Sequence, residues 1–141
     1  MRFRRPAFTT IELLVAVTIL AIVLAVALPR AQAIADRSAV RSAGRDARHV
    51  FGFAHRRAVI LGMRVAVWID SGARTLVVGD GEGEMLSRPL GATYGVSLSS
   101  TRDSMAYTPL GLGWGAANLT LIIRRGRAAD TVTISRLGRV K

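Results

Sequence analysis

The chain has 141 residues, enough for one small globular domain beside an apolar N-terminal third. It contains no cysteine, which excludes disulfides, thiolate metal sites and cysteine nucleophiles. The formal net charge is +11, and the basic side chains gather in residues 30–64 and 124–141, whereas residues 65–123 are slightly acidic. Basic surfaces of this kind would suit partners that carry phosphate groups, such as anionic lipid or DNA, but do not by themselves indicate such partners.

The first predicted element is an apolar helix from Phe8 to Leu28, in which Thr18 is the only polar side chain after residue 12. A helix of 21 residues rises about 31 Å, close to the hydrocarbon thickness of a bilayer. Pro29 is expected to kink this helix where it leaves the lipid rather than to end it. A short basic flank favours a cytoplasmic N-terminus; it consists of Arg2, Arg4 and Arg5.

A single carboxylate, Glu12, stands near the start of this apolar segment. A charge inside a membrane segment is costly and is usually functional. An ordinary signal peptide cleaved after Ala31-Gln32-Ala33 is the competing interpretation, with a mature chain starting at Ile34. Glu12 argues against it, because a charge in the apolar region weakens a signal peptide.

An amphipathic helix is predicted next, over residues 30–62, and Gly62 marks its end. Apolar residues recur at three- and four-residue steps and should pack on a globular domain; they are Val40, Ala43, Ala47, Val50, Phe51, Ala54, Ala58 and Leu61. The opposite side is basic and consists of Arg37, Arg41, Arg45, Arg48 and Arg56. We favour a solvated helix face for these arginines, although phosphates of lipid or DNA would also suit them.

The remainder of the chain reads as strands and turns, which predicts an α+β fold with the long helix packed on a small antiparallel sheet. The expected strands are residues 63–69, 74–78, 95–99, 119–123 and 131–135, and the first two should form a hairpin across Asp70-Ser71-Gly72-Ala73. Residues 80–84 form a polar loop, and residues 107–111 and 113–115 are expected as loops or turns.

The segment Ala7-Phe8-Thr9-Thr10-Ile11-Glu12-Leu13-Leu14 resembles the processing site of type IV pilin-like proteins, whose usual form is Gly followed by Phe-Thr-Leu-Ile-Glu. Ala7 replaces the common Gly and Thr10 replaces the common Leu. The resemblance implies that a prepilin peptidase cuts between Ala7 and Phe8 and that the new amine of Phe8 is methylated. Removal of the leader would lower the net side-chain charge to about +8.

Three further segments resemble the GspH/FimT branch of minor pilins and pseudopilins. They are Gly-Met-Arg-Val-Ala-Val after the helix, the turn Tyr107-Thr108-Pro109-Leu110-Gly111, and the pair Gly138-Arg139 near the end. The resemblance implies a leader over residues 1–7, a transmembrane and assembly helix over 8–29, an amphipathic helix over 30–62, and a periplasmic β-domain over 63–141. It also implies a structural protein and not an enzyme.

The same resemblance gives Glu12 a role in fibre assembly. When apolar helices leave the bilayer and stack, the Glu12 carboxylate needs a positive partner, and the amine of Phe8 on a neighbouring subunit would supply it. An ion pair in a low-dielectric environment depends strongly on distance, so this pair would set the axial register of the subunits.

A basic C-terminal cluster consists of Arg136, Arg139 and Lys141. Some FimT-type pilins bind DNA through such a region, so the resemblance makes these residues candidates for DNA binding. In an extended strand they would not all share a face, and Gly138 would supply a bend that realigns them. Binding would be directed at the backbone and sensitive to salt, because no aromatic residue is interleaved with the cluster.

No catalytic or metal site is expected. The acidic loop at residues 80–84 lacks the ligand series of an EF-hand, and His49 and His55 are spaced poorly for a shared metal. No cofactor motif is present, and nothing gathers Ser, His and Asp into a triad. Trp68 and Trp114 are expected as core or rim aromatics.

The function that these patterns favour is that of a minor pseudopilin of the type II secretion system, anchored in the bacterial inner membrane and built into a periplasmic pseudopilus. Its expected partners are other pilins, the prepilin peptidase and membrane lipid. The alternative is a minor pilin of a type IV pilus that captures DNA for uptake, so DNA is a further candidate partner.

Overall fold

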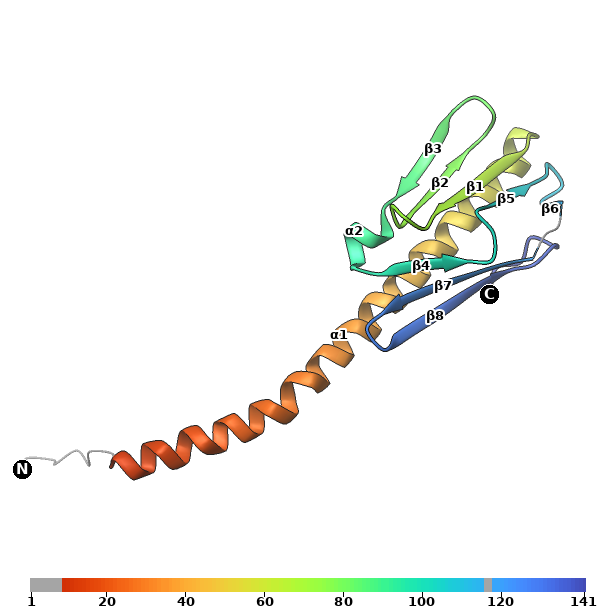
Figure 1. The fold of residues 1–141 in the computed structure, drawn as a ribbon. Helices are drawn as coiled ribbons and strands as arrows, with labels where there is room; N and C mark the ends of the chain where they lie inside the picture. Colours follow the sequence, from red (N-terminus) through yellow and green to blue (C-terminus); the bar gives the residue numbers. More distant parts are fainter. Residues whose placement is uncertain (1–8, 116–117) are drawn as a thin grey trace, which may run out of the picture. The chain divides into compact units, whose positions relative to one another are not determined.

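The computed structural model describes residues 9–115 and 118–141, and the chain divides into two compact units, Met1–Ile34 and Ala35–Lys141. Helix α1, Thr10–Leu61, contributes to both units and is continuous through Pro29, as predicted (Figure 1). It ends where predicted, at Gly62, whose φ of 64° is a left-handed conformation that glycine adopts without strain.

In the first unit, α1 carries an almost uninterrupted apolar surface. The large apolar side chains from Ile11 to Leu28 are all exposed to the surroundings of the chain. Among residues 9–115 and 118–141, α1 is the one helix that is long and apolar enough to cross a membrane, and the mean hydropathy of its most apolar window is 2.9. Length and composition therefore support the predicted membrane segment.

In the second unit, α1 buries one face against the β-strands. The buried residues recur at three- and four-residue steps, as the sequence predicted; they are Val40, Ala43, Gly44, Ala47, Val50, Phe51, Ala54 and Ala58. Most are small, which lets the strands approach the helix closely. The prediction was wrong for Leu61, whose side chain is 44% exposed at the end of the helix.

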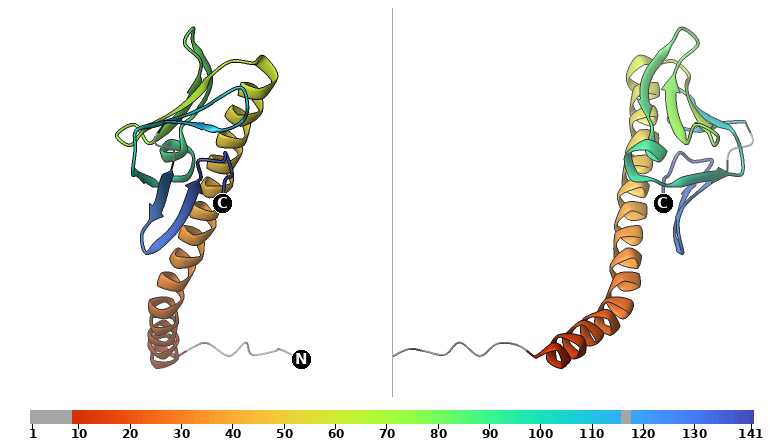
Figure 2. Two further views of the ribbon diagram at one scale, coloured as in Figure 1. Left: turned by 90° about the vertical axis from the view of Figure 1, so that its right-hand side faces the viewer. Right: turned by 60° about the vertical axis from the view of Figure 1, so that its left-hand side comes forward.

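Two antiparallel sheets, rather than the single sheet expected, cover this helix face (Figures 1 and 2). The five-stranded sheet has the order β3-β2-β1-β5-β6 and the three-stranded sheet the order β4-β7-β8. The strands are β1 Val65–Asp70, β2 Thr75–Gly79, β3 Glu84–Arg88, β4 Ser97–Ser100, β5 Ser104–Tyr107, β6 Gly113–Trp114, β7 Leu119–Arg125 and β8 Ala128–Ile134, and a short helix, α2 Leu90–Tyr94, precedes β4.

The expected hairpin is present, with β1 and β2 paired from Asp70↔Thr75 to Ala66↔Gly79. The Asp70 side chain accepts a hydrogen bond from the backbone N–H of Ala73 at 2.7 Å and so fixes the turn. β3, β5, β6 and α2 were not predicted, because they are short and their sequences are mixed in polarity. They fall in segments that the sequence indicated as loops or left unassigned.

The second sheet contributes the other half of the core. Alternate residues of β7 and β8 are buried against α1; they are Leu119, Leu121, Ile123, Val132 and Ile134. The chain then turns back on itself, and Val140 forms a β-bridge with Ile134. The C-terminal residues therefore extend the edge of this sheet.

Candidate functional site

The N-terminal end of α1 is capped by three reciprocal hydrogen bonds between Thr9 and Glu12. Thr9 donates from its backbone N–H and from its hydroxyl to Oε2 of Glu12, each at 3.0 Å. The Glu12 backbone N–H donates to Oγ1 of Thr9 at 3.2 Å. This arrangement is a capping box, which satisfies donors at the start of a helix. Ala7 and Phe8, the predicted cleavage and methylation residues, lie outside the described residues.

The capping box gives Glu12 a local function that the sequence analysis missed, although Thr9 and Glu12 have the three-residue spacing of such a box. Its hydrogen bonds from Thr9 all go to Oε2, so the carboxylate is oriented by its own chain. Further along the apolar segment, the hydroxyl of Thr18 donates to the carbonyl of Leu14 at 2.8 Å. A membrane-facing hydroxyl is thereby satisfied within the helix. The role of Glu12 in subunit register and the kink at Pro29 remain predictions.

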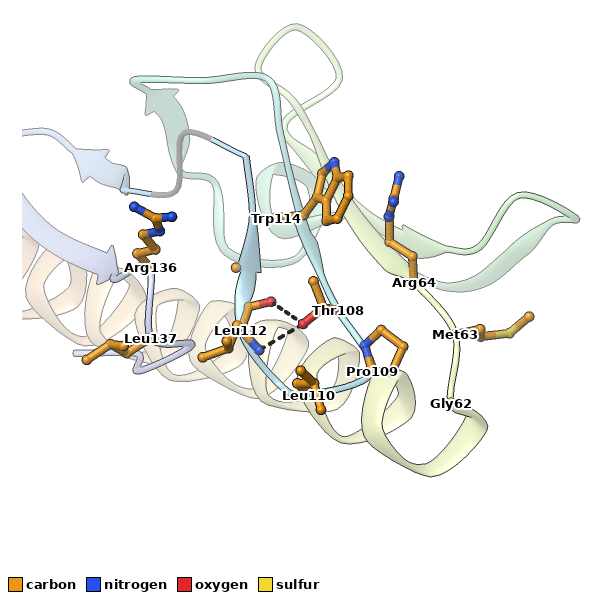
Figure 3. A pocket seen from close by; sticks show the side chains of 11 residues that line it. Gly62, Met63, Arg64, Thr108, Pro109, Leu110, Leu112, Trp114, Arg136 and Leu137 are labelled. Atoms are coloured by element: carbon orange, nitrogen blue, oxygen red, sulfur yellow. Dashed lines mark hydrogen bonds between the residues drawn. The ribbon is translucent and has the colours of Figure 1, made fainter.

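A groove of about 660 Å³ opens near the C-terminal end of α1, in the second unit (Figure 3). Three segments that are distant in sequence form it, namely residues 62–64, the loop from Thr108 to Trp114, and residues 136–137. The loop is held by Thr108, whose hydroxyl contacts both the carbonyl of Leu112 at 3.1 Å and its N–H at 3.2 Å. A rigid turn therefore presents the apolar side chains of the groove.

The groove exposes large apolar side chains to solvent. Leu110 is 83% exposed, Leu137 65% and Trp114 55%. The guanidinium of Arg64 lies 3.7 Å from the centroid of the Trp114 ring, a cation–π contact. These exposed apolar side chains make the groove a candidate contact surface. The sequence analysis missed this groove, although an apolar Leu110 inside a Pro-Leu-Gly turn was a signal for it.

The two C-terminal features of the GspH/FimT resemblance meet in space around His55. The His55 ring packs edge-on against Tyr107, with 5.4 Å between ring centroids. A Cβ at Gly111 would lie 2.7 Å from Nε2 of His55, and a Cβ at Gly138 would clash with the carbonyl oxygen of Gly111. Both glycines also have positive φ, 75° and 76°. Glycine is therefore required at both positions, and the turn, the tail and α1 lock together at this point.

Tyr107 is fully buried within this cluster. In the described part of the chain its hydroxyl has no hydrogen-bond partner. Burial raises the pKa of Tyr107, because it disfavours the charged phenolate. The aromatic ring fills the core, and a phenylalanine at this position would supply the same ring without the unpaired hydroxyl.

The predicted bend at Gly138 is confirmed. Ser135 accepts a hydrogen bond from the N–H of Gly138 at 3.0 Å and donates to the carbonyl of Arg139 at 2.9 Å, which closes a tight turn. Of the three predicted DNA-binding residues, Arg136 lines the groove, whereas Arg139 and Lys141 do not. The three basic residues, which are close in sequence, therefore do not line one common groove.

The arginine stripe on α1 is not uniformly solvated, contrary to the interpretation favoured from the sequence. Arg48 is half-buried and pairs with Asp130 of β8 at 3.1 Å. Arg37, Arg41, Arg45 and Arg56 are exposed, as expected. The stripe therefore includes one arginine that ties the second sheet to the helix.

Hydrogen bonds within the acidic loop, residues 80–84, fix its conformation. Oδ1 of Asp80 accepts hydrogen bonds from the N–H groups of Glu82 at 2.9 Å and Gly83 at 3.0 Å, an arrangement typical of an Asx-turn. His49 is exposed, whereas His55 belongs to the Tyr107 cluster. Over residues 9–115 and 118–141, no three or more His, Cys, Asp and Glu side chains gather to hold a metal ion.

Comparison with known proteins supports the N-terminal interpretation. Residues 2–28 match the family described as the prokaryotic N-terminal methylation motif. No curated protein matched the sequence.

Among solved structures, the chain is similar to the type IV minor pilin FimU of Pseudomonas aeruginosa, with a TM-score of 0.65 and 14% identity over 74% of this chain and 88% of that one. It is also similar to the minor pseudopilin EpsH from the type 2 secretion system of Vibrio cholerae, with a TM-score of 0.59 and 16% identity over 72% of this chain and 94% of that one. At these identities the likeness establishes the fold.

The chain thus combines a prokaryotic N-terminal methylation motif at residues 2–28 with the fold of the minor pilin FimU and the minor pseudopilin EpsH. The predicted α+β architecture, a long N-terminal helix packed on antiparallel strands, is confirmed. The solved proteins that share this fold are named as a minor pilin and a minor pseudopilin.

Proposed function

We propose that the protein is a minor pseudopilin of a type II secretion system, inserted in the inner membrane, cut between Ala7 and Phe8, methylated at Phe8 and built into a periplasmic pseudopilus. The observation that carries the proposal is the union, in one chain, of a methylation motif at residues 2–28 with the pilin fold. Neither feature requires chemistry by this chain, because the peptidase and the methyltransferase are other proteins.

The apolar part of α1 would act first as a membrane anchor and then as the core of the fibre. Inside the fibre Glu12 would be out of water, where an unpaired charge is costly. The capping box occupies Oε2 and leaves Oε1 for the methylated amine of Phe8 on a neighbouring subunit. Glu12 would therefore keep its helix cap through Oε2 and set the subunit register through Oε1.

The apolar groove supports a subunit role for the second unit. Leu110, Leu137 and Trp114 would lose exposed apolar surface if a neighbouring pseudopilin docked over them, and this loss favours association. A cysteine at Leu110 offers a direct probe, because the chain has no native cysteine. We expect photo-crosslinks to other pseudopilins from a benzophenone attached through maleimide to this cysteine, and none from the same label on a cysteine at the exposed Ser71.

Mass spectrometry of the membrane-extracted protein tests the processing step. A chain that begins at methylated Phe8 supports the proposal, whereas a chain that begins at Ile34 supports an ordinary signal peptide and refutes it. The secretion role is tested by deleting the gene and measuring the exported enzymes in the culture medium. Loss of secretion with normal pilus function supports the pseudopilin proposal, and the opposite pattern refutes it.

A minor pilin that captures DNA is the second candidate. The observation that favours it is the position of Arg136 in a groove that also contains Arg64 stacked on Trp114, since an exposed aromatic beside guanidinium groups suits nucleic-acid bases. Fluorescence anisotropy with a labelled DNA duplex tests it. The binding should weaken with salt and should fall in the Arg136→Ala/Arg139→Ala variant, whereas Arg56→Ala/Arg88→Ala should bind as before.

A further inference from the structure

Carboxylates at one end of the second unit are all engaged inside the domain. Asp36 pairs with Arg125 at 3.0 Å, and Asp46 accepts a hydrogen bond from the hydroxyl of Tyr94 at 2.9 Å. Asp130 of β8 pairs with Arg48. Asp36 and Asp130 are thus neutralised by Arg125 and Arg48 within the domain, whereas Asp46 keeps its negative charge beside a neutral hydroxyl.

Five exposed arginines surround these internal bonds: Arg37, Arg41, Arg45, Arg124 and Arg127. We call this group the basic collar. Within the described residues none of the five forms an ion pair, and Arg45 reaches only the hydroxyl of Ser42 at 3.1 Å. The three on α1 are spaced four residues apart, where like charges on a helix repel one another. Such an arrangement is stabilised when an anionic partner binds it.

The turn between β7 and β8 lies beside α1 (Figure 1), and the ion pair between Arg125 and Asp36 fixes it there. Besides its pair with Asp36, Arg125 donates from its guanidinium to the carbonyl of Tyr94 at 2.6 Å. A Cβ at Gly126 would clash with the Asp36 carboxylate, and the φ of this glycine is 55°. Glycine is thus required for the turn to approach the helix, and Arg124 and Arg127 flank the contact point.

The collar also lies close in sequence to the apolar segment. Nine residues separate Leu28 from Arg37, and nine residues of helix rise about 14 Å. The headgroup layer adds about 5–8 Å on each side of the hydrocarbon core, and the screening length at physiological salt is about 8 Å. At this distance the guanidinium group of Arg37 feels the charge of an anionic membrane surface, whereas Arg41 and Arg45 lie one and two turns further along α1.

We propose that the basic collar binds the phosphate groups of anionic phospholipids on the membrane face from which α1 emerges. Guanidinium matches phosphate with two parallel hydrogen bonds, and arginine is suited to such contacts. The contact would dock the domain on the membrane before assembly and would be broken when the subunit enters a fibre. The proposal rests on the membrane anchorage given under the proposed function.

The test uses the full-length protein reconstituted into vesicles of phosphatidylcholine alone or with 30% phosphatidylglycerol. A single cysteine at the exposed Ala129, next to the collar, carries a fluorophore, and a lipid with a spin-labelled headgroup serves as quencher. A second protein carries the fluorophore at the exposed Glu82 in the β2–β3 loop, which lies at the end of the second unit away from the β7–β8 turn (Figure 1). Flotation of the vesicles measures anchorage separately, so a failure of membrane insertion is distinguished from a failure of headgroup binding.

Two quadruple variants with the same charge change complete the design. One replaces four collar residues by glutamine: Arg37, Arg41, Arg124 and Arg127. The control replaces four exposed arginines elsewhere in the second unit: Arg56, Arg88, Arg102 and Arg139. Each arginine near an anionic surface changes the ratio of docked to undocked domain by about fivefold. The collar variant should therefore lose nearly all docking, and the control variant should keep it.

The expected result is quenching at residue 129 that is stronger with phosphatidylglycerol, weaker at 0.5 M NaCl and lost in the collar variant alone, with little quenching at residue 82. Equal quenching in the two lipids, or equal loss in both variants, would overturn the proposal. The proposal would also be overturned if phosphatidylglycerol had no effect and the collar variant lost affinity for a DNA duplex. The collar would then be a nucleic-acid-binding surface.

Discussion

The buried hydroxyl of Tyr107 makes a quantitative prediction about stability. A buried polar group without a hydrogen-bond partner costs about 1–3 kcal/mol, and the Tyr107 hydroxyl has no partner within the described residues. Tyr107→Phe removes the hydroxyl and keeps the ring against His55. We therefore expect the free energy of unfolding to rise by about 1 kcal/mol. For a domain of about 100 residues this raises Tm by roughly 4 °C.

The same substitution changes the alkaline limb of stability. Burial raises the pKa of Tyr107 above its ordinary value of about 10, so the unfolded chain loses this proton before the folded chain does. Stability from the neutral phenol is complete below pH 10 and falls as the pH rises toward the folded-state pKa. In Tyr107→Phe this loss is absent. The decline above pH 10 becomes shallower without vanishing, because a hydrogen bond to Asp46 also raises the pKa of Tyr94.

Chemical denaturation followed by tryptophan fluorescence, at pH 7 and at pH 10–11, provides the assay. Tyr94→Phe is the matched control, because its hydroxyl donates to Asp46 at 2.9 Å and its removal should cost about 1 kcal/mol. A Tyr107→Phe protein that is no more stable than the parent at pH 7 would refute the reasoning. It would mean that the hydroxyl is satisfied in solution.

Three further predictions concern the glycine turn at residue 138, the ion pair at the β7–β8 turn and the role of Glu12 in subunit register. Gly138→Ala should lower the free energy of unfolding by more than about 2 kcal/mol, because a positive φ and a backbone clash act together. Gly62→Ala is the control and should cost about 1 kcal/mol, because Gly62 has a positive φ but no described atom within 4 Å of the added Cβ. Urea unfolding measures both variants. Asp36→Asn should lower stability by about 0.5–1 kcal/mol because its pair with Arg125 is partly exposed, and 1 M NaCl should shrink the difference; an unchanged difference would argue against an ionic contribution. Glu12→Gln should leave membrane insertion intact and abolish incorporation into fibres, measured by shearing and immunoblotting, whereas Glu12→Asp should retain part of it; normal assembly of Glu12→Gln would refute the register role.

Local patterns in the sequence were sufficient for the elements whose residues interact over short distances. The spacing of small apolar residues from Val40 to Ala58 determined which face of α1 is buried, because that face repeats every three or four residues. The Asp70 turn determined the first hairpin, because the side chain bonds to the backbone three residues later. The N-terminal motif likewise depends on residue order within a short segment.

Only the tertiary structure decided which distant residues meet. Arg64, Trp114 and Arg136 form one groove although 72 residues separate the first from the last, and no periodicity encodes that distance. The pairing of Arg48 with Asp130 removed one arginine from a face that the helical wheel indicated as solvated. The reason is physical: backbone geometry sets which side chains share a helix face or a turn, whereas contacts between sheets depend on how several elements pack into one core.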